Sequence, residues 1–175
     1  MKSILNLYWN ICLFRRGPED VPGLSVILGI TLILNILVSL VVGIAFGKLA
    51  VSFAAISLVI STATVGFLIY TVLMLKKLEA RFRQTFTAVL GTDILITLLC
   101  SPLLWLVNQR EQTAGLNLPG SVLLGLMIWD LLIKGFIYQR AFDVGRFQGN
   151  LFSFSLFMLL TMLSDILRKQ MLGTG

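Results

Sequence analysis

The sequence predicts an all-α integral membrane protein, with five transmembrane helices preceded by a short amphipathic helix at the membrane interface. The chain has 175 residues, of which 57% are hydrophobic and 13% are charged, whereas soluble domains carry roughly 25% charged residues. A bilayer core about 30 Å thick needs about 20 helical residues to cross it. Five apolar stretches approach or exceed that length, at 24–46, 49–75, 86–107, 121–139 and 150–167.

The domain organisation follows from these stretches. Residues 24–175 form a five-helix transmembrane domain, and residues 1–23 form an interfacial helix and a linker. Too little polar sequence remains for a separate soluble domain. The apolar run at the N-terminus precedes Arg15 and Arg16 rather than following them, which is not the order of a cleavable signal peptide.

The segment 3–14 is too short to span a bilayer, yet it has an apolar face with two aromatic residues, Tyr8 and Trp9. Aromatic side chains of this kind favour the membrane–water interface, and Arg15 and Arg16 can contact headgroups there. Two interpretations stay open, because both bury the same apolar face. The helix lies on the membrane surface, or it packs on the protein itself.

Positive charge is distributed unequally between the two ends of the predicted spans. Nine Lys and Arg residues fall on the N-terminal side and four on the opposite side, with Lys134 inside a span. The positive-inside rule therefore predicts a cytoplasmic N-terminus and a C-terminus on the far side. The connector 76–85 keeps a helical period and is expected to prolong the second span. Its basic residues are expected to contact the membrane surface: Lys76, Lys77, Arg81 and Arg83.

Small and polar residues mark possible packing faces on the first two spans. The first span carries Asn35, Ser39, Gly43 and Gly47, and the second carries Ala50, Ala54, Ser57, Ser61 and Thr64. Close packing of small residues drives helix association in lipid. Because neighbours in sequence usually pack together, the two faces are expected to meet in a hairpin, although a face for another subunit stays open. Asn35 would bond a neighbouring helix or line a pathway.

Three ionisable residues lie deep inside predicted spans: Asp93, Asp130 and Lys134. Charges at this depth are costly and need partners or a water-lined cavity. Asp130 and Lys134 are four residues apart, so they share a helix face. The third and fourth spans are antiparallel, and Asp93 and Asp130 lie at similar depths, so all three residues are expected to form one cluster. It is either a structural ion pair or a proton or ion site.

Several functional classes lack their residues in this chain. The sequence contains no histidine and only two cysteines, far apart, so we expect no metal site and no catalytic triad. Lys134 beside Asp130 opposes the shared proton of an aspartyl protease. The basic residues flank apolar spans instead of forming a soluble basic stripe, which argues against nucleic-acid binding. We therefore expect no enzyme and no cofactor.

Three segments together resemble the Yip domain family (Ypt/Rab-interacting proteins) in its short bacterial form. They are NLYWNICLFRRGPEDVPG before the first span, RFRQTFTAVLGTDILITLLCSPLLWL over the third, and LLGLMIWDLLIKGFIYQRAFDVG over the fourth. The resemblance implies five closely spaced membrane helices and a non-enzymatic role through partners. The long cytoplasmic region of the eukaryotic members does not match here, so GTPase binding does not carry over. A bacterial inner membrane fits best, which places the C-terminus in the periplasm.

The first interpretation of the function is a scaffold or accessory subunit of a membrane assembly. It lies in the lipid bilayer and acts through helix–helix contacts with other membrane protein subunits or with copies of itself. The second interpretation is a small proton- or ion-coupled transporter that uses the cluster of Asp93, Asp130 and Lys134. The third is a lipid-handling protein whose basic connectors hold anionic headgroups.

Overall fold

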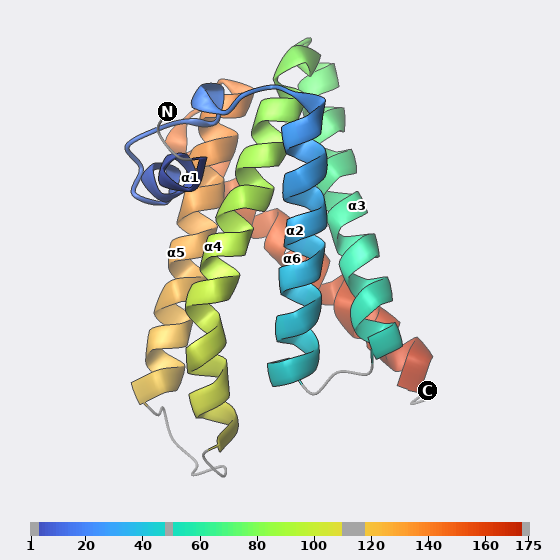
Figure 1. Cartoon of the computed structure of the whole chain (residues 1–175). Helices are drawn as coiled ribbons and strands as arrows, with labels where there is room; N and C mark the ends of the chain where they lie inside the picture. The colour runs from blue at the N-terminus through green and yellow to red at the C-terminus, as the bar shows by residue number, and fades with distance from the viewer. Residues whose placement is uncertain (1–3, 48–50, 110–117, 173–175) are drawn as a thin grey trace.

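The computed structural model describes residues 4–47, 51–109 and 118–172, and every regular element in these ranges is a helix (Figure 1). Five of the helices are long and apolar enough to cross a membrane, which confirms the predicted fold class. The elements in order are α1 (Ile4–Cys12), η1 (Pro18–Asp20), α2 (Ser25–Gly47), α3 (Val51–Leu75), η2 (Glu79–Arg81), α4 (Phe82–Gln109), α5 (Leu118–Phe142) and α6 (Arg146–Leu172).

Most of the long helices extend beyond the apolar stretches that predicted them. Helix α4 begins at Phe82, whereas the predicted span began at 86, and α6 begins at Arg146, whereas the predicted span began at 150. Hydropathy marks only the part of a helix that lies in hydrocarbon, and the helical hydrogen bonds continue into the polar interface.

The expectation that residues 76–85 prolong the second span is wrong. Helix α3 ends at Leu75, and Lys77 adopts a left-handed conformation with φ of 58°. The N–H of Leu78 then donates to the carbonyl of Leu73 at 2.8 Å, and the N–H of Lys77 donates to that of Met74 at 3.0 Å. This pair of bonds is a Schellman motif, which satisfies the last carbonyls of a helix and turns the chain away.

Two further helices end in the same way, and neither has glycine at the left-handed position. Phe14 after α1 has φ of 58°, and Asp143 after α5 has φ of 55°. The N–H of Arg15 donates to the carbonyl of Asn10, and the N–H of Val144 donates to that of Gln139. Glycine normally marks such a stop, so these three turns lack the usual local signal in the sequence.

These turns lie at one end of the bundle, which we call the basic end. Here the η1 segment and the α3–α4 and α5–α6 connections come together (Figure 1). The ammonium of Lys76 donates to the carbonyl of Phe142 at 2.8 Å, and Arg140 forms an ion pair with Glu19. The basic end therefore ties three connecting segments to one another.

Helix α4 is the central helix of the bundle, and it lies between α2 and α5 (Figure 1). It also contacts α1 and α3, while α6 runs antiparallel to α5 and crosses to α3. Although α2 and α3 are consecutive, α2 packs more extensively on α4 than on α3. The predicted hairpin contact exists, but it is the lesser of the two interfaces of α2.

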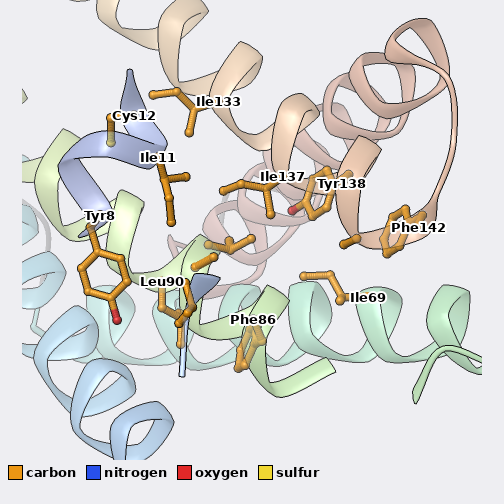
Figure 2. Packing of buried hydrophobic residues seen from close by; sticks show 14 of the residues in the cluster. Tyr8, Ile11, Cys12, Ile69, Phe86, Leu90, Ile133, Ile137, Tyr138 and Phe142 are labelled. Atoms are coloured by element: carbon orange, nitrogen blue, oxygen red, sulfur yellow. The ribbon is translucent and has the colours of Figure 1, made fainter. Parts of the chain in front are cut away.

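The N-terminal helix packs on the protein itself, which decides between the two interpretations left open by the sequence. Tyr8, Ile11 and Cys12 are buried against α4 and α5, beside Ile133 and Ile137 (Figure 2). The Tyr8 ring lies directly over Gly91, where any side chain would collide with it. The predicted surface contact is therefore wrong for Tyr8. Trp9, by contrast, is 41% exposed.

Helices α5 and α6 approach most closely at two glycines. A Cβ on Gly135 would collide with the side chain of Asn150, and a Cβ on Gly149 would lie 2.5 Å from the carbonyl oxygen of Gly135. Backbone-to-backbone contact of this kind requires residues without side chains. The crossing fixes the register of α6 against α5, and thereby the position of the lining residues that α6 contributes to the centre.

Candidate functional site: a polar cavity inside the bundle

Helices α4 and α5 bring the three predicted charges together. The ammonium nitrogen of Lys134 lies 2.8 Å from Oδ2 of Asp130, one turn earlier on α5. It also lies 2.8 Å from Oδ1 of Asp93 on α4. One lysine thus bridges two carboxylates from neighbouring helices, and we call these three residues the Asp–Lys–Asp triad.

With both carboxylates ionised, the triad carries one negative charge more than its lysine can neutralise. In addition, Oδ1 of Asp130 is buried and has no hydrogen-bond partner within the part of the chain that the structure describes. A buried acceptor without a donor costs free energy, and a net charge at bilayer depth costs more. The arrangement is therefore chemically incomplete, and a proton or a cation would complete it.

A cavity of about 200 Å³ lies beside the triad, and all five spanning helices contribute to its wall. The side chains of Asp93, Lys134 and Asp130 keep 29%, 26% and 22% of their surface accessible, although they lie inside the bundle. Other polar side chains line the same space: Asn35, Ser39, Ser61, Thr62, Thr97, Tyr138 and Ser153. The cavity has room for several water molecules and enough polar groups to hold them.

Two hydrogen bonds between helices hold the cavity wall in place. The amide of Asn35 on α2 donates to the carbonyl of Leu90 on α4 at 3.2 Å. The hydroxyl of Ser153 on α6 donates to the carbonyl of Leu131 on α5 at 2.9 Å. Such bonds are favourable in lipid, where the alternative is a polar group in hydrocarbon. Asn35 thus combines the two roles considered for it, because it bonds a neighbouring helix and also lines the cavity.

The remaining residues of the predicted packing faces have different positions. Ser39 and Ser61 line the cavity from α2 and α3, whereas Ala54 is buried in the protein. The hydroxyls of Ser57 and Thr64 donate to carbonyls of their own helix. Of the remaining residues, Gly43 is half-buried and Gly47 lies at the end of α2. Ala50 lies outside the described residues.

Sequence reasoning did not select three of the polar lining residues: Thr62, Thr97 and Ser153. Tyr138 continues the row of Asp130 and Lys134 on α5, as its four-residue spacing predicts. Thr97 follows Asp93 by four residues, so the same spacing could have found it. Thr62 and Ser153 carry no such signal, because their inward position depends on how α3 and α6 are rotated in the bundle.

Helix α1 lies behind the triad, on the other side of α4 and α5 from the cavity. None of its residues lines the cavity. Burial raises the pKa of Cys12 from its ordinary value of 9.0 to about 12, and the charges of Asp130 and Asp93 add to the rise. The thiol is therefore uncharged, and it presents apolar surface on the side of α4 and α5 away from the cavity.

The basic residues predicted to contact the membrane surface all lie at the basic end. Arg15, Lys76, Lys77, Arg81 and Arg83 are exposed, and Arg16 is half-buried. Their contact with lipid headgroups, and that of Trp9, stays a prediction.

The side chains that line the cavity include groups that can carry charge and form hydrogen bonds. No three His, Cys, Asp or Glu side chains converge anywhere in the described residues. The site offers two carboxylates, one ammonium, one phenol and several hydroxyls and amides. Such a set can exchange protons and coordinate a small hydrogen-bonding or cationic species.

No protein-family model, no curated protein and no solved structure matches this chain. The fold and the site together define an integral membrane protein with a polar cavity, lined by two aspartates and one lysine, between its spanning helices.

Proposed function

We propose that this protein is a small, non-enzymatic proton- or cation-coupled carrier, and that the central cavity is its binding site. The observation that supports this proposal is the Asp–Lys–Asp triad, which pairs two carboxylates with a single ammonium group and lines a polar cavity. A purely structural ion pair would be neutral and tightly packed, because both features lower the cost of charges in lipid.

The two carboxylates differ in the contacts they make. Asp93 and Asp130 each give one oxygen to Lys134, but Oδ1 of Asp130 has no donor among the described residues. Asp130 is therefore the acceptor for the proton or cation, and Lys134 holds the pair of acids in place. Binding neutralises the triad, and release restores its charge. A carrier needs this difference between its loaded and empty states.

Ion flux into liposomes tests the proposal directly. The purified protein is reconstituted with a pH-sensitive dye inside, and sodium, potassium or proton gradients are imposed. We expect cation- or proton-driven flux above that of empty liposomes. Asp130→Asn should abolish it without unfolding the protein, because the neutral pair of Asp93 and Lys134 remains.

Asp165→Asn is the matched control, since Asp165 is an exposed carboxylate on α6 that does not line the cavity. This variant should transport like the parent protein. Equal flux from the parent protein, the Asp130→Asn variant and empty liposomes would overturn the carrier proposal.

The scaffold role stays a prediction, and it depends on partners. The resemblance to the Yip domain family and the bacterial inner-membrane location also stay predictions. Collection of the basic residues at one end of the bundle supports the proposed cytoplasmic N-terminus and periplasmic C-terminus. Purification in mild detergent followed by mass spectrometry tests the scaffold role. A partner protein in fixed stoichiometry favours the scaffold, whereas a homo-oligomer alone favours the carrier.

A further inference from the structure

A second site lies at the basic end, in a groove between the end of α1, the last turns of α5 and the start of α6. It shares no lining residue with the central cavity, because a different face of α5 forms its wall. Figure 1 shows α1 beside the upper part of α5.

The wall that α5 contributes changes from apolar to basic along the helix. Leu132, Phe136 and Arg140 follow one another at four-residue spacing, so they form one row on the helix surface. Eight residues of helix span about 12 Å. The row therefore runs from the hydrocarbon depth of the bilayer to the level of its headgroups.

The other walls continue this gradient. The ring of Phe14 meets the ring of Phe136 edge-on at 5.5 Å, and Phe14 and Leu132 are 42% and 43% exposed. Arg146 and Asn150 lie one turn apart on α6 and line the polar part of the groove. Apolar side chains that remain accessible thus lie directly below polar and basic ones.

The two arginines in the groove are positioned for an anion. The guanidinium of Arg140 stacks over the Phe136 ring at 5.0 Å and forms an ion pair with Glu19 through Nη1. A guanidinium has five donors, so this ion pair leaves others free. Arg146 is exposed, and none of the groove's lining residues is acidic.

We propose that this groove binds one anionic phospholipid. Its phosphate lies between Arg140 and Arg146 and accepts a hydrogen bond from the amide of Asn150, while one acyl chain lies along Phe136 and Leu132. A free phosphate would use the arginines and leave the apolar wall uncovered. A lipid satisfies both parts of the groove, and it is the solvent that surrounds them.

Native mass spectrometry of the purified protein tests the site, with phosphatidylglycerol, phosphatidylcholine and inorganic phosphate as separate probes. We expect phosphatidylglycerol to bind at least about fivefold more tightly than phosphatidylcholine. Arg146→Gln should weaken phosphatidylglycerol binding by about fivefold, and Arg140→Gln/Arg146→Gln should weaken it further.

The matched control is Arg81→Gln/Arg83→Gln, which removes the same charge from the same end of the bundle but lies outside the groove. This variant should bind phosphatidylglycerol like the parent protein. An equal loss in the control variant would show general attraction to the basic end and would overturn the proposal. Equal binding of the two lipids, or displacement of phosphatidylglycerol by inorganic phosphate, would overturn it as well.

Discussion

Helices α2 and α4 both cross the membrane, but they differ in how much of each helix is buried inside the protein. Of the apolar window that defines each span, 11% is buried inside the protein for α2 and 33% for α4. Helix α4 is also the less apolar of the two, and it carries the buried threonines Thr85, Thr87 and Thr92 as well as Asp93.

The comparison of these two helices indicates that polar groups inside a span favour its burial in the bundle. In water, the most apolar segment is the one that is buried. In lipid, an apolar helix loses nothing by facing the solvent, whereas hydroxyls and carboxylates need protein partners. The hydroxyls of Thr87 and Thr92 donate to carbonyls of α4 itself, and that of Thr85 donates to the carbonyl of Arg81, just before α4. Asp93 finds its partner on α5. Of these two helices, the one with more polar groups inside its span therefore has more neighbours.

The largest expected effect comes from removing Lys134, the only cation of the triad. Lys134→Met leaves two carboxylates facing each other at bilayer depth, and we expect a loss of about 3–5 kcal/mol in stability. Thermal unfolding in mild detergent, followed by size-exclusion chromatography, measures the loss.

Two further variants separate charge from packing at the same position. Asp130→Asn keeps one neutral ion pair and should unfold close to the parent protein. Asp93→Asn/Asp130→Asn/Lys134→Met has no charge at the site and should recover most of the loss. Equal instability of all three variants would mean that packing, and not the unpaired charge, sets the cost.

A second test concerns the docking of α1 on α4. Tyr8→Ala removes a ring that covers Gly91 and the hydrogen bond to Thr31, so we expect about 3 kcal/mol of destabilisation. Trp9→Ala is the matched control on the exposed face of the same helix and should change stability little.

Cys12 reports on the same contact. With a pKa of about 12 instead of 9.0, its thiolate fraction at neutral pH is about a thousandfold lower than that of a free thiol. In a Cys100→Ala background, maleimide should therefore label the folded protein very slowly and the Tyr8→Ala variant much faster. Fast labelling of the parent protein would contradict the docked position of α1.

A third test compares a crowded glycine with an open one. Gly149→Ala forces a methyl group against the carbonyl of Gly135, and we expect a loss of about 1–3 kcal/mol. Gly29→Ala on α2 has nothing within 4 Å of the added methyl group and should be neutral or slightly stabilising. Thermal unfolding measures both variants, and equal losses would show that α5 and α6 do not cross at Gly149.

The smallest expected effect is a gain. Lys77 has a left-handed conformation that costs a side-chain-bearing residue about 1 kcal/mol, so Lys77→Gly should stabilise the protein by about that amount. Arg83→Gly, inside the first turn of α4, should have the opposite sign. The two midpoints of thermal unfolding, measured under identical conditions, give the comparison.

Local chemistry allowed much of this protein to be predicted from its sequence. The length of each apolar stretch set the five spans, because the thickness of a bilayer fixes how many residues must be apolar. The spacing of Asp130 and Lys134 placed them on one helix face, and the cost of charge in lipid required partners for them. The alternation of spans put Asp93 at a similar depth on the neighbouring helix.

Tertiary structure alone decided which faces meet. Helix α2 packs mainly on α4 rather than on its neighbour α3, Tyr8 turns inward over Gly91, and Ser61 and Ser153 face a shared cavity. In water, the hydrophobic effect drives apolar faces together, so the sequence pattern indicates which face of a helix is buried. Lipid exerts no such force between apolar helices. The choice of partner then depends on shape and on a few hydrogen bonds, which form only when all the helices are in place.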